Sequence, residues 1–316
     1  MIDNTDLTKL SRVVVGMDAG GTKTKIVLAD ENGKTLDVFT GGGMNVNSFG
    51  ALVTGEHLAG ILDEVEARIG SLKKIAAVCI GVAGATNPAT QEVMKRVLKE
   101  KGVEAPAKIV GDHIIALYAA NGTGEGMILI AGTGSVCFGR KMDENGNEFL
   151  GRSGGWGHLI DDPGSGYYIG KEMLSEIVRA EDGREEPTIL WPMLQEKISI
   201  RTMADLISFV YGKDTGKKEI AALSQIVQEG VRQQDAAALR ITQKAAGELA
   251  ELVIAVAKQM KQTTGSVMLN GGELVYNEPL RKMLGDILAE RLPGFSLEWP
   301  KLDAAEGAVL AAMELI

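Results

Sequence analysis

Two short stretches rich in glycine and threonine carry groups that could bind phosphate. The first, at residues 18–24, reads DAGGTKT, and the second, at residues 131–135, reads AGTGS; each follows an apolar run. Glycines expose backbone N–H groups and threonine hydroxyls add donors, so each turn suits a polyphosphate. Taken singly, either stretch is equally explained as a plain hairpin turn. Two such turns in corresponding places favour phosphate binding.

Two aspartates near these turns suggest a metal ion and a base. Asp18 opens the first turn, where a carboxylate would repel phosphate unless a cation lay between them, so Asp18 predicts Mg²⁺. Asp112 follows an apolar run and precedes a helical stretch. It fits a helix N-cap and equally a general base for a hydroxyl nucleophile, and both roles can coexist. Neither GxxxxGK[ST] nor GxGxxG after a strand occurs, which disfavours P-loop and Rossmann sites.

The most unusual stretch is residues 154–166, GGWGHLIDDPGSG. Trp156 among glycines is poorly explained as core, whereas an aromatic face beside amides and carboxylates can hold a sugar ring. Ser165 opens a predicted helix whose N-terminus could meet an anion. Residues 41–47 (GGGMNVN) offer side-chain amides, Asn45 among them, that suit sugar hydroxyls. A glycine-rich turn with Asn as a cap explains that loop equally well.

The elements that must position these residues alternate between strands and helices. Strands are predicted at 12–18, 25–30, 35–40, 74–82 and 107–110, with helices at 46–69, 90–101 and 114–121. A related pattern restarts with strands at 126–130, 136–140, 266–269 and 296–299, a mostly helical region at 163–261, and helices at 278–291 and 304–313. This order predicts an α/β fold with mixed sheets covered by helices, duplicated in two halves that face one another.

The composition sets the remaining bounds. With 316 residues, two domains are expected. The formal charge of −9 argues against nucleic acid as a partner. Cys79 and Cys137 lie in apolar runs without a CxxC or Cys/His cluster, so no zinc or iron–sulfur site is expected. The N-terminus is polar and no apolar stretch is long enough to span a bilayer, so we expect no signal peptide, no membrane partner and a cytoplasmic protein.

In their order along the chain, DAGGTKTK, GGGMNVNS, VGDHIIA, IAGTGS, GGWGHLIDDPGSGYYIG and VMLNGGEL form a recognisable set. The set resembles the N-acetylglucosamine kinase branch of the sugar kinase/actin/Hsp-type ATPase superfamily, within the broader group of BadF-type ATPases. The resemblance runs from Val13 to about Ala312. Its GGWGH…D.GS element is the specific part, because the Gly-Thr turns mark only the superfamily.

The resemblance implies two ribonuclease H-like domains facing across an ATP cleft. The first spans residues 1–113 and is completed by the C-terminal helix 303–316; the second, larger domain spans 114–302. The resemblance also implies an ATP-dependent hexosamine kinase, which uses Mg²⁺ to transfer the γ-phosphoryl group to the 6-hydroxyl of N-acetylglucosamine or a close hexosamine. The amino sugar is then the small-molecule partner, and a helix-rich second domain of this kind is typical of a homodimer.

The resemblance also implies a role for each matching residue. The first phosphate loop is formed by Gly20, Gly21, Thr22 and Lys23, with Asp18 holding Mg²⁺ through water, and the second by Gly132, Thr133 and Gly134. The adenosine pocket is lined by Gly271 and Gly272, the base is Asp112, and the sugar is held by Asn45, Gly155, Trp156 and Asp162. Asp162 is preferred to Asp161 because it occupies the family's position before the D-x-G-S turn, whereas Asp161 stands where the family often has glycine.

Two other functions remain open at this point. One is an ATP-driven activator of a partner enzyme of the acyl-CoA dehydratase or reductase type, whose relatives share an iron–sulfur cluster between subunits. The other is a non-catalytic regulator that binds sugar or nucleotide. Within the kinase interpretation the acceptor is also open, because N-acetylglucosamine, glucosamine, N-acetylmannosamine and a muramic-type sugar present similar hydroxyls.

Overall fold

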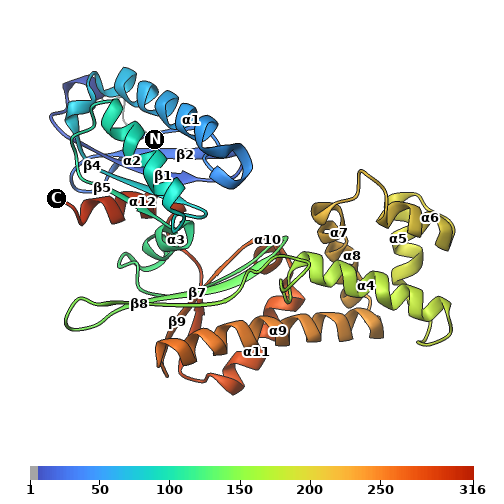
Figure 1. Cartoon of the computed structure of the whole chain (residues 1–316). Helices are drawn as coiled ribbons and strands as arrows, with labels where there is room; N and C mark the ends of the chain where they lie inside the picture. Colours follow the sequence, from blue (N-terminus) through green and yellow to red (C-terminus); the bar gives the residue numbers. More distant parts are fainter. Residues whose placement is uncertain (1–5) are drawn as a thin grey trace. The chain divides into compact units, whose positions relative to one another are not determined.

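The computed structural model describes residues 6–316, with only the backbone of Asn47 and Ser48 (Figure 1). The first five residues, part of the polar N-terminal segment considered above, lie outside the described residues. The chain divides into two compact units. Unit 1 extends to Glu125 and includes Pro300–Ile316, and unit 2 comprises Gly126–Trp299.

Unit 1 is built on a five-stranded mixed sheet. Its strands run in the order β3-β2-β1-β4-β5. The pairs β1–β2 and β2–β3 are antiparallel, whereas β1–β4 and β4–β5 are parallel. The bounds are β1 (Val13–Ala19), β2 (Lys23–Ala29), β3 (Thr35–Gly42), β4 (Ile75–Val82) and β5 (Ala107–Val110).

Helices cover both faces of this sheet because its central strand is apolar on both sides. Val13 and Val15 belong to one buried cluster and Val14 to another, as expected when successive side chains point to opposite faces. The first cluster is completed by α1 (Val46–Ile69) and α2 (Pro88–Glu100), the second by α3 (Asp112–Asn121) and α12 (Ala304–Met313).

The C-terminal helix α12 packs closely into unit 1. A Cβ on Gly16 of β1 would lie 2.5 Å from the Ala305 carbonyl oxygen, and one on Gly307 would lie 2.0 Å from that of Ile115 in α3. These glycines let the three backbones approach. Because α3 packs against α12, the unit boundary follows α3 at Glu125, whereas the sequence placed it before this helix, after residue 113.

Unit 2 contains a second five-stranded sheet with the same topology. Its order is β10-β9-β6-β7-β8, in which β9 pairs in parallel with β10 and β6, and β7 pairs antiparallel with β6 and β8. The two mixed sheets confirm the predicted α/β fold and its repeated pattern. The bounds are β6 (Gly126–Ala131), β7 (Ser135–Met142), β8 (Glu148–Gly154), β9 (Gly265–Asn270) and β10 (Phe295–Glu298).

The long helix α9 (Ala236–Met260) packs on this sheet across small residues. A Cβ on Gly139 of β7 or Gly151 of β8 would lie 2.7 Å or 3.1 Å from the Val256 side chain, so glycine lets helix and strands meet. The other helices of unit 2 are α4 (Gly166–Glu181), α5 (Leu190–Ile198), α6 (Met203–Val210), α7 (Lys217–Ala222), α8 (Ser224–Arg232), α10 (Gly272–Tyr276) and α11 (Glu278–Arg291).

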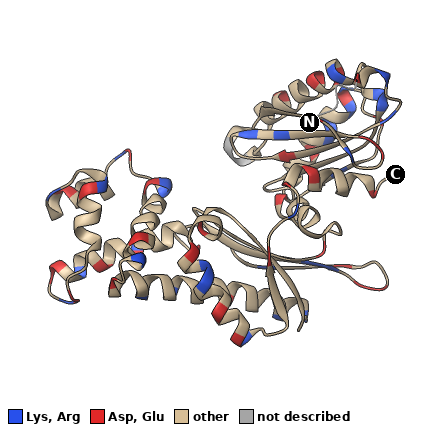
Figure 2. Cartoon of the chain, turned by 180° about the vertical axis from the view of Figure 1, so that it is seen from behind, with Lys and Arg blue, Asp and Glu red and all other residues tan. Residues whose placement is uncertain are grey.

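Charged residues of both signs are distributed over both units. Figure 2 shows Lys and Arg interspersed with Asp and Glu along the helices. Among residues 6–316, no helix is both long and apolar enough to cross a membrane.

Candidate functional site

The β1–β2 turn of unit 1 presents its backbone outward. The Gly20 N–H donates to the Lys23 carbonyl at 3.1 Å, which closes the turn. Between them, the N–H groups of Gly21 and Thr22 have no hydrogen-bond partner among the described residues, and both residues are exposed. The turn therefore has two free donors, as a phosphate-binding loop requires.

The loop that carries Asn45 packs beside this turn. The Met44 N–H donates to the Gly20 carbonyl at 3.2 Å. A Cβ on Gly43 would lie 2.9 Å from the carbonyl oxygen of Gly21. Two segments that are separate in the sequence, residues 20–22 and 43–45, are thus held together in unit 1.

Behind the turn lies a group of carboxylates. Asp18 is paired in register with Lys25 of β2, and Lys25 in turn forms an ion pair with Asp303 at the start of α12. Burial raises the pKa of the Asp18 carboxyl, and the negative charges of Asp112 and Asp303 raise this pKa further, against an opposing effect of Lys25. A cation bound here would relieve the repulsion.

This donor set fits Mg²⁺ rather than a cation enclosed by protein ligands. Among residues 6–316 there is no group of three or more His, Cys, Asp or Glu side chains that could hold a metal ion. Magnesium usually keeps several waters and takes its other ligands from one or two carboxylates and from substrate phosphates. Asp18, beside a turn with free N–H groups, fits a carboxylate that holds the ion through water.

Asp112 is the first residue of α3 and follows β5 closely. The helix N-cap is Gly111, without a side-chain hydrogen bond. The N-cap interpretation of Asp112 is therefore wrong: its Oδ1 accepts the N–H of the next residue, His113, at 2.9 Å. The side chain is 50% exposed and is free of a capping role.

The surroundings of Asp112 keep it ionised. Although half of the side chain is exposed, loss of surrounding water raises its pKa. The hydrogen bonds and charge of His113, whose Nδ1 lies 3.6 Å from Oδ1, outweigh this and hold the pKa of Asp112 below its usual value. A carboxylate that stays deprotonated at neutral pH can accept a proton from a hydroxyl group.

The β6–β7 turn of unit 2 is one residue shorter than the first turn, because Ala131 pairs with Ser135 whereas Ala19 pairs with Thr24. The Gly132 N–H donates to the Gly134 carbonyl at 2.9 Å. The N–H groups of Thr133 and Gly134 have no partner among the described residues. Each unit thus has one hairpin with two free backbone donors.

Two further segments pack against this second turn. The Gly166 N–H at the start of α4 donates to the Gly132 carbonyl at 2.8 Å, and the Tyr168 N–H donates to Ser165 Oγ at 3.2 Å. These two N–H groups are therefore not available to an anion, contrary to the expectation for this helix. Gly271, with φ of +96°, lies so close to the hairpin that a Cβ would be 2.3 Å from the Ala131 oxygen.

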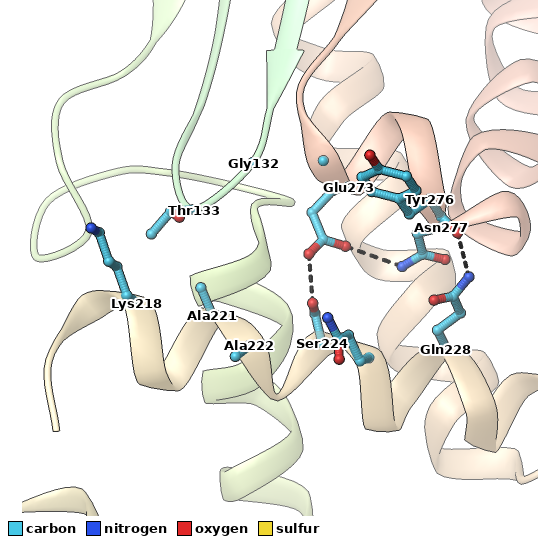
Figure 3. A pocket seen from close by; sticks show the side chains of 12 residues that line it. Gly132, Thr133, Lys218, Ala221, Ala222, Ser224, Gln228, Glu273, Tyr276 and Asn277 are labelled. Atoms are coloured by element: carbon cyan, nitrogen blue, oxygen red, sulfur yellow. Dashed lines mark hydrogen bonds between the residues drawn. The ribbon is translucent and has the colours of Figure 1, made fainter. Parts of the chain in front are cut away.

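A pocket of about 430 Å³ opens beside the second turn. Figure 3 shows Thr133 and Lys218 toward one end of it and Tyr276, Asn277 and Gln228 toward the other. One end thus offers a Gly-Thr turn and an ammonium group, and the other a ring and two side-chain amides. This polarity suits a nucleotide, with its phosphates at the first end and its base at the second.

A half-buried carboxylate, that of Glu273, joins the walls of this pocket. Glu273 accepts hydrogen bonds from Ser224 Oγ at 2.5 Å and from Asn277 Nδ2 at 3.2 Å (Figure 3). Burial raises the pKa of Glu273, and these two hydrogen bonds partly oppose the rise. Glu273 therefore links α8 to the segment that follows α10.

The predicted sugar residues of unit 2 lie in two places. Trp156 follows β8 and is 60% exposed, and the Arg152 guanidinium lies 4.5 Å from its ring centroid. Asp162 is buried, and its Oδ2 accepts a hydrogen bond from Lys217 Nζ at 2.7 Å. A Cβ on Gly134 would lie 2.8 Å from that oxygen, so Asp162 sits against the second turn. Asp161 is exposed.

Comparison with known proteins assigns the family. The model of the BadF/BadG/BcrA/BcrD ATPase family matches residues 15–312. The chain belongs to this ATPase family. An N-acetylmuramic acid/N-acetylglucosamine kinase of Clostridium acetobutylicum is 33% identical over 309 residues, covering 95% of this chain and 98% of that protein. An N-acetyl-D-glucosamine kinase of Dictyostelium discoideum is 29% identical over 315 residues, covering 95% and 98%.

Solved structures share the fold. A candidate N-acetylglucosamine kinase from Chromobacterium violaceum has a TM-score of 0.70 at 23% identity, covering 95% of this chain and 98% of that one. A ROK family glucokinase from Streptomyces griseus, in complex with glucose and AMPPNP, has a TM-score of 0.52 at 18% identity, covering 96% and 99%. At these identities the likeness concerns the fold alone.

In this member of the BadF/BadG/BcrA/BcrD ATPase family, both cysteines are buried within strands. Cys79 lies in β4 and Cys137 in β7. Burial raises the pKa of the Cys79 thiol to about 12 and raises that of Cys137 as well. A cluster shared between subunits needs thiolates at a surface. The placement of these cysteines does not favour the iron–sulfur activator.

Several residues of the candidate site were missed by sequence reasoning. They come from segments without a motif, and include Lys217, Lys218, Ser224, Gln228, Glu273 and Asn277. Within a helical region such polar residues are indistinguishable from a solvated face. Glu273 alone carried a signal, because it directly follows the Gly271-Gly272 pair.

Proposed function

We propose that the chain is an ATP-dependent kinase that transfers the γ-phosphoryl group of ATP to the 6-hydroxyl of N-acetylglucosamine or a close hexosamine. The observation that carries the proposal is the pocket beside the second turn, which has cationic and amide ends in one elongated site. The C. acetobutylicum and D. discoideum relatives, named as amino-sugar kinases, support the acceptor class.

The nucleotide is proposed to bind along that pocket. Gly271 and Gly272, which lie against the second turn, are proposed to line the adenosine pocket. Gly132, Thr133 and Gly134 are proposed to form one phosphate loop, in which Thr133 and Gly134 have free N–H groups. Gly20, Gly21, Thr22 and Lys23 form the other phosphate loop. Free N–H groups in both turns support these assignments.

Asp112 is proposed as the general base. As the sugar 6-oxygen forms its bond to the γ-phosphorus, the bond from that phosphorus to the β,γ-bridging oxygen breaks, and ADP leaves. The hydroxyl proton passes to the Asp112 carboxylate, which its lowered pKa keeps ionised. Magnesium, when bound, neutralises charge on the phosphates, and Asp18 is the residue proposed to hold it through water.

The sugar is proposed to be held by Asn45, Gly155, Trp156 and Asp162. Trp156 keeps most of its ring exposed although Arg152 stacks on it, and Asp162 Oδ1 has no hydrogen-bond partner among the described residues. An exposed ring and an unpaired carboxylate oxygen suit the apolar face and a hydroxyl of a pyranose. The homodimer and the cytoplasmic location remain predictions.

The test is an ADP-release assay with ATP and Mg²⁺ across N-acetylglucosamine, glucosamine, N-acetylmannosamine and N-acetylmuramic acid, with product masses measured by mass spectrometry. We expect ADP release that depends on the sugar, a sugar phosphate of matching mass, and loss of both in Asp112→Asn. Phosphorylation at the 6-position is read from the ³¹P–¹H couplings of the product. ADP release without a phosphorylated sugar would instead indicate an ATPase that acts on a protein partner, and sugar binding without turnover a regulator.

A further inference from the structure

We propose that Lys217 is a phosphate-binding residue of the nucleotide site and that Asp162 is the residue that positions it. The inference deepens the proposed function and rests on the nucleotide site described there. Lys217 directly follows Thr215-Gly216, in a region without any motif, and the resemblance assigned it no role.

The first observation is where the ammonium group lies. A Cβ on Gly134 would be 3.0 Å from Lys217 Nζ and 2.8 Å from Asp162 Oδ2, so both charged groups press against the second turn. The free N–H groups of Thr133 and Gly134 belong to the same turn. A positive charge and two backbone donors are thus gathered at one place.

The second observation is that Lys217 has donors to spare. A lysine ammonium has three N–H donors, and the only hydrogen bond of the Lys217 ammonium among the described residues goes to Asp162. The Lys217 side chain is 33% exposed, whereas that of Asp162 is 5% exposed. The lysine therefore faces outward from its partner with two donors available to an anion.

The third observation is that the lysine is held firmly. The start of α7 is closed by a hydrogen bond from the Gly216 N–H to Glu219 Oε2 at 2.8 Å. The helix is packed against α4 so closely that a Cβ on Gly170 would lie 2.0 Å from the Ile220 oxygen. Its neighbour Lys218 lines the pocket near Thr133 (Figure 3). A preorganised cation at the phosphate end loses little entropy when it binds.

A simpler explanation is that Lys217 only neutralises the buried Asp162. That role requires a hydrogen bond to Asp162 and predicts no preference among ligands. Phosphate binding predicts that the effect of Lys217 grows with the number of phosphates on the nucleotide, since each adds negative charge. Asp162 serves both proposals, because Oδ2 holds Lys217 and Oδ1 remains for the sugar.

The test measures the affinities of adenosine, ADP and the β,γ-imido analogue of ATP, with Mg²⁺ and without sugar, by isothermal titration calorimetry. The main variant is Lys217→Gln, which keeps an N–H donor for Asp162 and removes the charge. We expect the imido analogue to bind about tenfold more weakly or worse, as for loss of a charged hydrogen bond, with adenosine affinity within about twofold of wild type. Lys217→Arg should recover part of the loss.

The matched control is Lys213→Gln, which makes the same charge change at an exposed residue of the same segment and should bind all three ligands as wild type does. Asp162→Asn should also lower the affinity for the imido analogue. The variant that carries both Lys217→Gln and Asp162→Asn should bind this analogue no more weakly than Lys217→Gln alone. The proposal would be overturned if Lys217→Gln lowered the affinities for adenosine and the imido analogue equally, or changed neither affinity. Because no turnover is needed, this result is independent of whether the wild-type protein phosphorylates a sugar.

Discussion

The two Gly-Thr hairpins both leave backbone N–H groups free, but they differ in their electrostatic surroundings. Each closes with one hydrogen bond and leaves two N–H groups free. Behind the β1–β2 turn stand Asp18, Asp112 and Asp303, whereas beside the β6–β7 turn stands Lys217, held by Asp162. If both turns bind phosphate as proposed, the carboxylates make a cation necessary at the first, whereas Lys217 offers a positive charge at the second. Two units with the same sheet topology thus differ in the side chains beside corresponding turns.

The largest expected effect comes from removing Asp112, the proposed base in unit 1. Asp112→Asn should lower kcat by about 100- to 10,000-fold, the usual contribution of a general base, while the affinity for the imido analogue of ATP changes by less than about threefold. Sugar phosphate formation and calorimetry measure the two quantities. Asp63→Asn, which neutralises an exposed, ion-paired carboxylate of the same unit, is the control and should keep wild-type kcat. Normal turnover in Asp112→Asn would remove Asp112 from the mechanism.

A second substitution tests whether activity depends on a cation held by Asp18 beside the β1–β2 turn. Asp18→Asn should raise the Mg²⁺ concentration for half-maximal activity by about 10- to 100-fold, the usual cost of losing a group that holds a metal indirectly. The protein should not lose thermal stability, because the substitution removes a half-buried carboxylate that is repelled by Asp112 and Asp303. Magnesium titrations of initial rate, with thermal melts, decide this. An unchanged Mg²⁺ midpoint would contradict the role of Asp18.

The two turns should also differ in their tolerance of a methyl group. Gly134→Ala should lower the free energy of unfolding by about 1–3 kcal/mol, because its Cβ would overlap Asp162 and Lys217. Gly21→Ala should change it by less than about 0.5 kcal/mol, because nothing lies within 4 Å of that Cβ. Urea unfolding of both variants measures the difference, and equal stability would show that the second turn is not tightly enclosed.

The smallest expected effect is a shift in pH dependence. The raised pKa of Asp18 means that the folded state binds this proton more tightly than the unfolded state. The Asp18 contribution to the free energy of unfolding should therefore fall as pH rises from the ordinary aspartate range through the raised pKa. Over the same interval Mg²⁺-dependent activity should increase, because the ionised form binds the cation.

Asp303→Asn sharpens this prediction. It removes one negative neighbour and leaves Lys25 without its ion pair, and both changes lower the pKa of Asp18. Asparagine still caps α12. The acid limb of kcat/KM against pH should therefore move to lower pH. No movement, or movement to higher pH, would mean that Asp18 does not set this limb.

Much of the fold could be predicted because its elements have strong local patterns. Val13, Val14 and Val15 mark a strand buried on both faces, and the predicted strands of both sheets were found with small differences in bounds. The exception is β8 (Glu148–Gly154), which was not predicted. Its sequence, EFLGRSG, has glycines and little alternation, and it becomes a strand by pairing with β7 beneath α9.

The sequence by itself determined the two hairpins and their chemistry, because glycine, threonine and aspartate act within a few residues of one another. It did not determine what surrounds them. The sequence suggested Asp112 as a helix N-cap, whereas the N-cap in the structure is Gly111. Lys217 is far from Gly134 in the chain, and its position follows from the packing of α7 on α4, where Gly170 admits the Ile220 carbonyl. Contacts of this kind depend on which helices fit together in three dimensions, so only the tertiary structure could bring a lysine to the second turn.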